Sequence, residues 1–580
     1  MTSRLRKADL GELLDRAVEH HRAGTLDDAE RLYREAQAIA PDNPDVLQRL
    51  GTVLSARGDE AEREEALALL ERAAELSGQI TADTAGLHSN LGNALRRAER
   101  HDDAERVLLD VVGTLPDYWE AWHNLGHVYK DLKRDDEAAG ALRRATALEP
   151  TVAANFAVLG DVLTRLGRLN AAVSAFRRAL DLGYAQYDVL NYLAVVHRQL
   201  GELDESERLL RQVLEIVPDS PIGNTNLAVV LAQTGRFAES REYHDRAVEL
   251  DPDNITLVAN RAYGRIAGGD IPSAWADWEH SMANGPRGTE RILPGRRWRG
   301  EDVSAERVMV YREQGIGDEF LFASCYGDVA RSCAHLVIEC EPRVATLFTR
   351  SFPDATVRPQ TVDARGEHLP EPDFDVVVPA GSVPVFRRAT VTDFPDQRSY
   401  LVADPVRVAT WRERLSSMPH PRVGISWRSK VTTAERRLEY TRLAEWGAIF
   451  GVPGASFFNL QYDECERELA DAERRFDVPI HHWLSVDYMN DFEDVAALMM
   501  NLDLVIAPRN AVAMLAGALG VPTVMMGNRW DWSDLGTDTC PWLPAVELVY
   551  RELGQEWDAV LATAAGRVTA LTAERHTTER

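Results

Sequence analysis

The first half of the chain repeats one pattern of apolar, small and polar positions at a fixed interval. A small residue, mostly after leucine as in "LG" or "LA", recurs every 34 residues at Gly92, Gly126, Gly160, Ala194, Ala228 and, in a looser copy, Ala262. Ala17 and Gly51 are also 34 residues apart, while the step from Gly51 to Gly92 is longer. Such a period predicts a stack of supersecondary units, each too small to bury its apolar face alone.

Two further positions keep the same phase. Twelve residues after the small position, another small residue stands at Ala29, Ala104, Ala138, Ala172, Ser206, Ser240 and Ala274. Twelve residues further, proline stands at Pro41, Pro116, Pro150, Pro218, Pro252 and Pro286, with Tyr184 as the exception. Small residues allow two helices to approach closely, and proline ends the second helix. This pattern resembles the tetratricopeptide repeat. The resemblance implies about eight units over residues 9–287, which form a right-handed α-solenoid with a concave groove.

One position that faces this expected groove is unusually rich in asparagine. Two residues before the small position stand Asn90, Asn124, Asn226 and Asn260, and Val158 and Tyr192 interrupt the series. A carboxamide offers a donor and an acceptor together, so it can pair with both groups of a peptide unit. The series resembles the asparagine ladder of O-GlcNAc transferase, which implies that the groove holds an extended acceptor protein. The alternative is that asparagine simply suits this position in many repeats.

After the repeats, the pattern changes to alternating strands and helices. Short apolar runs predict strands at "ERVMVY", "AHLVIEC", "ATVRPQ", "FDVVVPA", "RVGISW", "ASFFNLQ", "LDLVIAP" and "PTVMMG". Strands that alternate with helices predict parallel sheets covered by helices. We therefore expect two Rossmann-like lobes, at residues 300–402 and 403–575, which face a cleft. Ligands of such sheets bind at the carboxyl ends of the strands.

Composition narrows the range of partners. The net charge of -27 argues against a nucleic-acid partner and against attachment to anionic lipid. The start of the chain lacks the apolar stretch of a signal peptide, and the longest uncharged run is too short to span a bilayer. No two of the five cysteines have the C-x-x-C spacing, so the sequence indicates neither a disulfide framework nor a zinc site. We expect a cytoplasmic protein without membrane insertion.

The stretch "YREQGIGDEFLF" follows the first predicted strand of the first lobe. Gln314, Gly315 and Gly317 form a loop, and we expect a helix to begin near Asp318 or Glu319. The loop would place backbone N–H groups at the end of the sheet. Asp318 either faces the cleft as a carboxylate or caps the helix.

Polar residues also follow the predicted strands of the second lobe. "GISWRSK" brings Ser426, Trp427, Arg428 and Lys430 to the rim of the cleft, with Arg436 and Arg437 close behind. "NLQYD" places Gln461 at another strand end, and "APRNA" places Arg509, Asn510 and Ala511 at the start of a helix. The basic residues and the helix N–H groups could bind a phosphate, although solvated charges on a loop are the alternative. "DFD" at Asp373 to Asp375 looks like a D-x-D metal motif, but it more simply marks the start of a strand, and we expect no metal.

The pieces "QGIGDEFLFASCYGDVA", "VGISWRSK", "FFNLQ", "LDLVIAPRNAVAMLAGALGVPT", "RWDW" and "CPWLPAVEL" resemble, in this order, bacterial tetratricopeptide proteins with a glycosyltransferase domain related to the heptosyltransferases. The resemblance covers nearly all of residues 300–575 and implies a B-type glycosyltransferase fold. It further implies that Asp318 is the catalytic base and that a nucleotide-sugar lies against Ser426, Arg428, Gln461 and the turn at Asn510. The combination with repeats also resembles flagellin glycosyltransferases.

One stretch departs from those relatives. Where they commonly show S-x-D-T-x-x-A-H, this chain has Arg509, Asn510 and Met514 in place of the Asp, Thr and His. We expect Arg509 to make the pocket more attractive to anions. The change indicates either another donor, such as a CMP-linked nonulosonic acid in place of a nucleotide diphosphate sugar, or lost activity.

The sequence therefore favours a protein glycosyltransferase that needs no metal or cofactor besides its nucleotide-sugar substrate. The repeat groove would hold an acceptor protein, with flagellin as a candidate, and present a Ser or Thr hydroxyl to Asp318. Two alternatives stay open. One is an interaction scaffold with degenerate transferase lobes, and the other is a transferase that acts on a saccharide or a lipid-linked acceptor.

Overall fold

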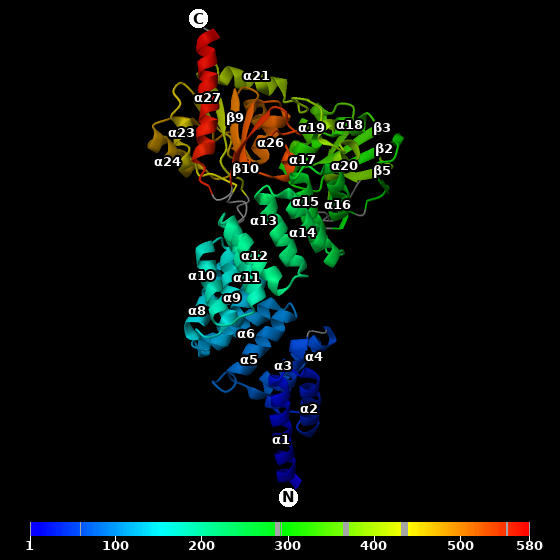
Figure 1. Ribbon diagram of the computed structural model, residues 1–580, viewed down its shortest axis with the longest axis vertical. Coiled ribbons are helices and arrows are strands. Elements are labelled where there is room, and N and C mark those ends of the chain that lie inside the picture. Colours follow the sequence, from blue (N-terminus) through cyan, green and yellow to red (C-terminus); the bar gives the residue numbers. More distant parts are fainter. Residues whose placement is uncertain are drawn as a thin grey trace. The chain divides into compact units, whose positions relative to one another are not determined.

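The computed structural model describes residues 2–57, 60–284, 291, 293–362, 371–430, 439–552 and 555–578. Within these residues, paired helices come first and two parallel β-sheets with short helices follow (Figure 1). The chain divides into two compact units, Met1–Val196 and His197–Arg580. Each unit is described by itself.

The first unit consists of helical hairpins that follow the 34-residue period. Its helices are α1 (Thr2–Arg22), α2 (Leu26–Ile39), α3 (Pro44–Arg57), α4 (Glu60–Ser77), α5 (Ala85–Arg97), α6 (His101–Thr114), α7 (Trp119–Asp131), α8 (Asp135–Leu148), α9 (Ala153–Arg165) and α10 (Leu169–Asp181), and α11 (Gln186–Gln199) leads into the second unit. A Cβ added at Gly92 would lie 2.5 Å from Leu108 Cγ, and one at Gly126 would lie 2.5 Å from Leu142 Cγ. Close packing therefore requires these small residues, and the prediction of repeat hairpins is confirmed.

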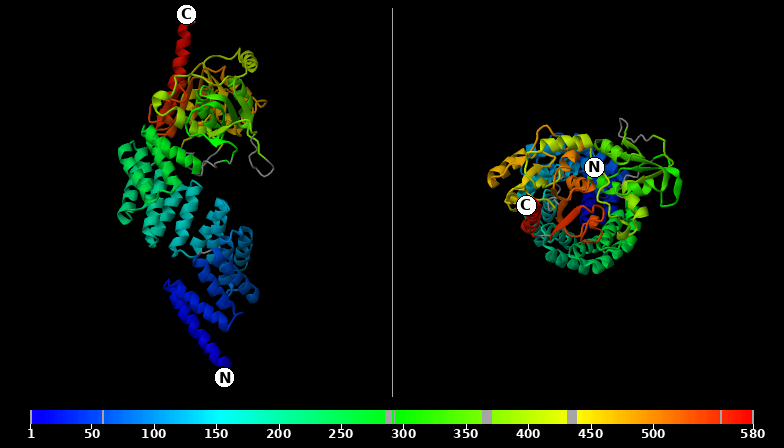
Figure 2. Two further views of the ribbon diagram at one scale, coloured as in Figure 1. Left: turned by 90° about the vertical axis from the view of Figure 1, so that its right-hand side faces the viewer. Right: turned by 90° about the horizontal axis from the view of Figure 1, so that it is seen from above.

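The second unit begins with the remaining repeat helices. These are α12 (Leu203–Ile216), α13 (Pro221–Gln233), α14 (Phe237–Leu250), α15 (Ile255–Ala267) and α16 (Ile271–Asn284). Of these, α15 and α16 lie nearest to the first sheet in Figure 1, and the green helices of Figure 2 show the same repeats from the side. Trp275 and Trp278 of α16 are buried, and their indole N–H groups donate to the carbonyl oxygens of Arg388 at 3.0 Å and Gly381 at 2.8 Å. The sequence placed a boundary between repeats and lobes at residue 287, whereas one continuous core joins the last repeats to the sheets.

The first sheet is parallel, with strand order β1-β5-β2-β3-β4. Its strands are β1 (Arg296–Arg297), β2 (Val303–Tyr311), β3 (Cys333–Cys340), β4 (Thr356–Pro359) and β5 (Val376–Pro379). The helices between and after them are α17 (Ile316–Ala323), α18 (Tyr326–Ala330), η1 (Pro342–Val344), α19 (Ala345–Ser351), η2 (Ala380–Ser382), α20 (Val383–Arg387) and η3 (Val391–Asp393). The order reverses between β2 and β5, so the loop after β2 lies at a topological switch point.

The second sheet is also parallel, with strand order β11-β10-β9-β6-β7-β8. Its strands are β6 (Arg422–Ile425), β7 (Ser456–Asn459), β8 (Ile480–His481), β9 (Leu504–Pro508), β10 (Thr523–Asn528) and β11 (Val546–Arg551). Its helices are α21 (Pro405–Arg414), η4 (Leu443–Glu445), α23 (Gly447–Phe450), α24 (Glu466–Phe476), α25 (Phe492–Met499), α26 (Ala511–Ala518), η5 (Trp532–Asp534) and α27 (Asp558–Thr578). This is the 3-2-1-4-5-6 order of a doubly wound sheet, with its switch point between β6 and β9.

The sheets explain why the predicted strands read as continuous apolar runs. In β9, Val505 and Ala507 belong to one core cluster, and Leu504 and Ile506 belong to another. A parallel sheet that is buried on both faces needs apolar residues at every position. The eight predicted strands and their parallel arrangement are confirmed, whereas β1, β8 and β11 were not predicted.

Two further expectations concern metal and membrane. Asp373 and Asp375 precede β5 and pair with Arg358 at 2.7 Å and Arg307 at 2.8 Å, so arginines occupy both carboxylates of the "DFD" stretch. Among the described residues, no group of three or more His, Cys, Asp or Glu side chains could hold a metal ion. None of the helices in the described ranges combines the length and the apolar composition needed to cross a bilayer.

Candidate functional site

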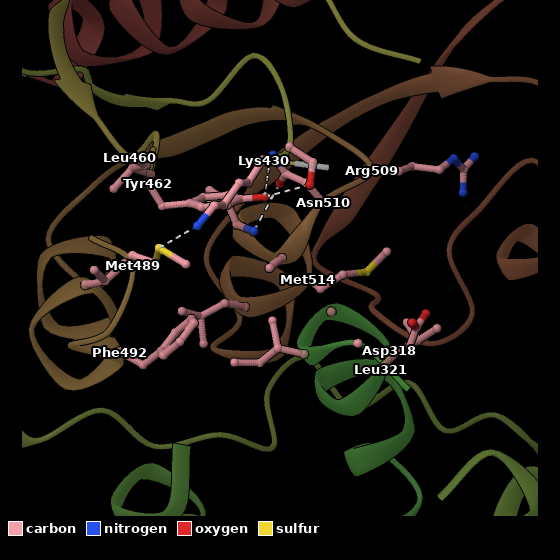
Figure 3. A pocket seen from close by; sticks show the side chains of 18 of the residues that line it. Asp318, Leu321, Lys430, Leu460, Tyr462, Met489, Phe492, Arg509, Asn510 and Met514 are labelled. Carbon is pink, nitrogen blue, oxygen red and sulfur yellow. Dashed lines mark hydrogen bonds between the residues drawn. The ribbon is translucent and has the colours of Figure 1, made fainter. Parts of the chain in front are cut away.

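A cavity of about 560 Å³ lies between the two sheets of the second unit. It is lined by residues that follow β2, β6, β7 and β9, and by side chains of α25 and α26 (Figure 3). The ends of β2, β6 and β9 are the switch points of the two sheets, where open α/β folds bind their ligands. The volume is within the range of small-molecule sites.

The first lobe contributes the glycine-rich loop and its acid. Gly315, Gly317 and Asp318 line the cavity, and Asp318 lies in the first turn of α17. A Cβ at Gly317 would lie 3.7 Å from the backbone of Ala511, so the starts of α17 and α26 face each other. The helix begins earlier than predicted, with Gly315 as its N-cap residue, so the alternative that Asp318 caps the helix is wrong.

Gln314 lies outside this cavity. With Arg291, Arg312, Glu313 and Gln360 it lines a separate cavity of about 120 Å³, and its carbonyl accepts a hydrogen bond from Arg312 at 3.1 Å. The sequence grouped Gln314 with the two glycines, but the chain turns between them.

Two acidic residues near the loop were not foreseen. Burial raises the pKa of Glu313 to about 8, although its carboxylate accepts a 2.7 Å hydrogen bond from the Gly381 N–H, and the charge of Asp318 contributes to the increase. Burial also raises the pKa of Glu319 to about 7, against the opposing effect of Arg312. Both acids can therefore hold a proton near neutral pH, next to the loop that carries Asp318.

Ser426, Gln461 and Asn510 come together in a buried hydrogen-bond network. The Ser426 hydroxyl donates to Gln461 Oε1 at 3.0 Å and accepts from Asn510 Nδ2 at 2.9 Å. Gln461 Oε1 also accepts from the backbone N–H groups of Trp427 at 3.2 Å and Arg428 at 3.3 Å. Of the three, only Asn510 lines the cavity. The network ties together the ends of β6, β7 and β9, on which the lining residues stand.

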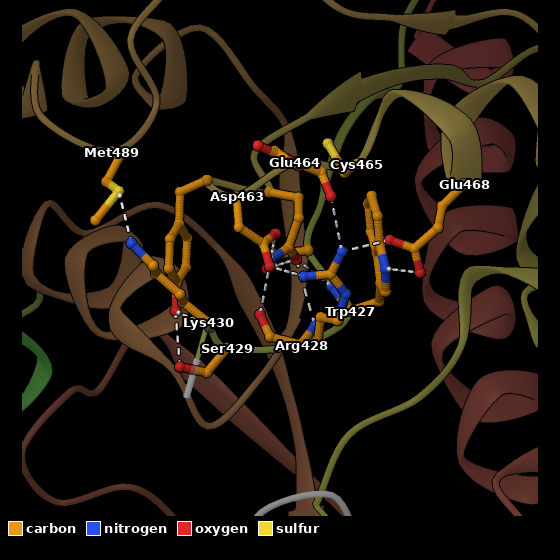
Figure 4. A network of polar contacts seen from close by, with 12 residues as sticks. Trp427, Arg428, Ser429, Lys430, Asp463, Glu464, Cys465, Glu468 and Met489 are labelled. Carbon is orange, nitrogen blue, oxygen red and sulfur yellow. Dashed lines mark hydrogen bonds and ion pairs between the residues drawn. The ribbon is translucent and has the colours of Figure 1, made fainter. Parts of the chain in front are cut away.

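Trp427 and Arg428 also lie outside the cavity lining. Trp427 is fully buried on the other face of the sheet, and its indole donates to Glu468 at 3.3 Å (Figure 4). Arg428 forms ion pairs with Asp463 and Glu468. Its charge is therefore balanced within the lobe. Arg436 and Arg437, the other members of the predicted basic cluster, lie outside the described residues.

Lys430 is placed differently from the two arginines that line the cavity. Arg343 pairs with Glu341 at 2.9 Å, and Arg509 pairs with Asp534 at 2.7 Å. In the part of the chain that the structure describes, the Lys430 ammonium is paired with no carboxylate and lies 3.8 Å from Met489 Sδ (Figures 3 and 4). An unpaired ammonium in a cavity is available to an anionic ligand.

Arg509 does not act as a free cation. Its guanidinium lies 3.5 Å from Asp531 Oδ1, donates to Ser533 Oγ at 2.8 Å and donates to Asp534 Oδ2 at 2.8 Å. Burial acts to lower the pKa of Arg509, but Asp531 and Asp534 raise it overall. Burial raises the pKa of Asp534 to about 6. The expectation that Arg509 makes the pocket attractive to anions therefore does not follow from its position, because local carboxylates offset the charge.

The start of α26 is already capped. Asn510 Oδ1 accepts hydrogen bonds from the N–H groups of Val512 at 3.0 Å and Ala513 at 3.2 Å. Ala511, the first helical residue, lines the cavity next to Gly317. The Asn510 side chain thus binds two of the N–H groups that we expected to bind a phosphate. The N–H group of Ala511 is then the one at the start of the helix.

An apolar wall was the main feature that sequence reasoning missed. Phe492, Val495 and Met499 of α25 line the cavity at the i, i+3, i+7 spacing of one helix face. Further lining residues that were not predicted are Leu321, Arg343, Tyr440, Leu460, Tyr462, Tyr488, Met489, Leu515, Asp531, Trp532 and Ser533. The spacing was visible in "FEDVAALM", but it is equally typical of a helix that faces a core.

The asparagines of the groove positions are half-buried in both units. Asn90 Nδ2 donates to Thr52 Oγ1 at 3.2 Å, and Asn124 Nδ2 donates to Ser89 Oγ at 2.9 Å, so each bonds to the preceding repeat. Asn124 Nδ2 also donates to the Ser89 carbonyl at 3.1 Å, so its carbonyl oxygen is the group that can still serve a peptide, whereas Asn90 can offer its second N–H as well. Asn226 and Asn260 stand at the same position of α13 and α15 in the second unit.

Comparison with known proteins supports the repeats. Residues 43–260 match the family model described as the C-terminal domain of cilia and flagella-associated protein 70. Protein FlbA of Caulobacter vibrioides is 34% identical over 313 residues, which are 52% of this chain and 52% of FlbA. The match thus spans about half the length of that relative.

Solved structures that resemble the chain include the MamA protein, at 23% identity over 30% of this chain and 94% of MamA, with a TM-score of 0.28. The APC/C hetero-tetramer Cut9–Hcn1 is another, at 17% identity over 48% of this chain and 53% of that chain, with a TM-score of 0.38. Residues 43–260 of the chain are thus similar to a tetratricopeptide-repeat family model, and the C-terminal region contains two parallel sheets.

Proposed function

We propose that the protein is a metal-independent glycosyltransferase of the B-type fold, which transfers a sugar from a nucleotide-activated donor to a Ser or Thr of a protein held by its repeats. One observation carries the proposal. A single cavity between two doubly wound sheets brings Asp318 of the first lobe together with Lys430, Asn510 and Ala511 of the second. An acid on one lobe, and on the other a cation that pairs with no carboxylate of the described residues, suit a reaction that removes a proton from one substrate and releases a phosphate from the other.

In this mechanism the Asp318 carboxylate accepts the proton of the acceptor hydroxyl. The hydroxyl oxygen then forms a bond to the anomeric carbon while the bond from that carbon to the donor phosphate breaks. Lys430 and the Ala511 N–H stabilise the charge that develops on the phosphate. Glu313 and Glu319, with their raised pKa values, keep the surroundings of Asp318 less negative than three ionised carboxylates would.

Asp318→Asn tests the base. The amide keeps the size of the side chain but cannot accept the proton, so turnover should fall by a factor of about 10² to 10⁴ while donor binding is retained. Sugar transfer is measured by intact-mass spectrometry of a co-expressed acceptor, with flagellin tested first. Asp354→Asn, an exposed change in the same lobe, is the matched control and should keep full turnover. Undiminished transfer by Asp318→Asn would remove Asp318 from the mechanism.

The acceptor class can be separated by truncation. Removal of residues 1–196 deletes one compact unit and leaves the buried tryptophans of α16 in place. If the acceptor is a protein, this truncated chain should show a clearly raised KM for the protein acceptor and unchanged donor binding, because Asn90 and Asn124 are lost while Asn226 and Asn260 remain. If the acceptor is a saccharide or a lipid-linked glycan, transfer should survive the truncation.

An interaction scaffold is the second candidate, and the state of Arg509 favours it. Arg509 stands where the transferases that this chain resembles have an acidic residue. Its guanidinium is paired with the carboxylates of Asp531 and Asp534. Calorimetry with CMP, UDP, GDP and their sugar conjugates separates the two functions. A scaffold should bind none of them, whereas a transferase should bind one and lose that binding in Lys430→Ala.

A further inference from the structure

A second, smaller cavity adjoins the first on the side of the repeats. It has a volume of about 200 Å³ and is lined by Gln233 of α13 and by Asn528, Arg529, Trp530 and Glu552 of the second lobe. Glu439, Arg509 and Asp531 line both cavities, so the two meet along one shared wall. This cavity is smaller than usual small-molecule sites and leaves no room for a nucleotide-sugar.

On the side of the repeats, this cavity is lined by Gln233, which lies on the same helix as the asparagine at the expected groove position, Asn226. Gln233 comes seven residues after Asn226 on α13. Seven residues are close to two full turns of an α-helix, so both carboxamides lie on the same face. Immediately beyond, the ring of Phe237 packs edge-on against Trp530 at 4.8 Å, which holds this end of α13 against the lobe.

The side-chain oxygen of Gln233 lacks a hydrogen-bond donor among the described residues. Its Oε1 atom is buried and accepts no hydrogen bond from any residue that the structure describes. A buried acceptor without a partner is unfavourable, and a ligand with an N–H group would relieve that cost. A backbone amide is such a group.

The cations of the second cavity already face carboxylates. Arg509 pairs with Asp534, and Arg529 lies 3.3 Å from Asp538 and 3.8 Å from Glu552. An anionic ligand therefore finds no unmatched positive charge there, and an acidic side chain would meet net repulsion. A neutral or basic segment fits better.

We propose that the second cavity binds the acceptor polypeptide immediately beside its reacting Ser or Thr, with Gln233 accepting a hydrogen bond from a backbone N–H of that segment. The inference rests on the proposed function and adds a subsite to it. Gln233 would connect the asparagine face of α13 to the cavity that contains Asp318. The preferred acceptor carries no acidic residue at the position that enters this subsite.

Cross-linking tests the contact without any need for turnover. Benzoylphenylalanine is placed at position 552 of the full-length chain, an exposed lining position of the second cavity that leaves Gln233 unchanged. The chain is irradiated with a randomised library of unstructured peptides that contain Ser or Thr. The control carries the same group at Glu242, an exposed position of α14. We expect peptides captured at 552, depleted in Asp and Glu beside the Ser or Thr, and little capture at 242. Equal capture at both positions, or none at 552, would overturn the subsite.

Kinetics give a second measurement on the same residue. Gln233→Leu should raise the KM for the acceptor about threefold to tenfold, because one hydrogen bond is lost, and leave the KM for the donor unchanged. Gln233→Trp should fill the cavity and raise the acceptor KM further. Gln199→Leu is the control, since Gln199 stands at the same repeat position on α11 and lines neither cavity. An unchanged acceptor KM in both Gln233 variants would contradict the subsite while leaving the transferase intact, whereas absence of transfer and of nucleotide binding in the unmodified protein would refute the transferase itself.

Discussion

The repeats of the first unit and the last repeats of the second share one sequence pattern but differ in what they pack against. In the first unit, Trp122 of α7 donates its indole N–H to the carbonyl of Pro116, six residues away, at 2.8 Å. In the second unit, Trp278 of α16 donates to the carbonyl of Gly381, 103 residues away, at 2.8 Å. Trp278 also packs on Trp532 at 5.2 Å, and Trp532 lines the main cavity. The same 34-residue unit thus forms a self-contained stack in one place and part of a candidate active site in the other.

Truncation should produce the largest difference between the two sets of repeats. Removal of residues 1–196 should leave a chain that unfolds cooperatively, because the cut falls between the compact units. Removal of residues 1–286 should give an insoluble or molten chain, because it takes away α12–α16 and uncovers apolar surface around Trp532. Circular dichroism and thermal unfolding of both truncated chains measure this. Equal stability of the two would show that the last repeats are not part of the α/β core.

The two tryptophans allow a finer comparison. Trp278→Ala should lower the free energy of unfolding of the second unit by about 3–5 kcal/mol, since a fully buried indole and its hydrogen bond are lost. Trp122→Ala should cost less than half as much, because that ring is only half-buried and its bond is local. Urea unfolding of the full chain gives both values. A larger cost for Trp122→Ala would reverse the interpretation.

A change in pH should affect the contributions of His127 and Glu319 to the stability of their units in opposite directions. Burial lowers the pKa of His127 in α7 to about 3, with His123, Arg96 and Lys130 acting in the same direction and Asp131 against them. The unfolded chain binds a proton near pH 6.5, so this contribution to stability is present above that pH and is lost as the pH falls toward 3. Glu319 in the second unit behaves oppositely, since its raised pKa of about 7 gives stability that is lost as the pH rises from about 4.5 to 7.

His127→Gln should therefore make the first unit less sensitive to acid, by about 1 kcal/mol at pH 5, after allowance for partial exposure. Urea unfolding at pH 7 and pH 5 measures the change. A difference between pH 7 and pH 5 as large as that of the unsubstituted chain would mean that burial of His127 is not the cause.

The smallest expected effect is that of one groove asparagine. Asn124→Ala removes hydrogen bonds to Ser89 and should lower the stability of the first unit by about 1 kcal/mol. Capture of extended peptides should fall in the same variant if the groove holds them. A variant that loses stability but captures peptides as before would assign Asn124 to repeat stacking alone.

Much of the fold could be predicted because the repeats are periodic and the parallel strands are apolar on both faces. Gly92 and Gly126 identify the helix contacts directly, since any larger residue would collide with Leu108 or Leu142. The strands β1 and β8 were not predicted because each is only two residues long, too short to form an apolar run. The association of α16 with the lobes was not predicted, because in the sequence Trp275 and Trp278 look like ordinary core residues of a repeat.

The site was predictable only in part, because sequence gives the end of a strand but not the direction of each side chain. Gly315, Gly317, Asp318, Lys430, Asn510 and Ala511 line the cavity, whereas Ser426, Trp427, Arg428 and Gln461 do not. In "ISWRSK" successive residues point to opposite faces, so Trp427 enters the far core while Ser426 joins the network below the cavity. The partners of Arg509 lie in a later loop, and its neutralisation could not be inferred from local sequence.

The packing of Trp278 on Trp532 has a consequence for how such proteins diversify. A gene fusion that transplanted only the α/β lobes onto another solenoid would leave behind the helices that support the Trp532 loop. Recombination that exchanges repeats is therefore expected upstream of α12, and natural chimeras should carry α12–α16 along with the lobes as one inherited block.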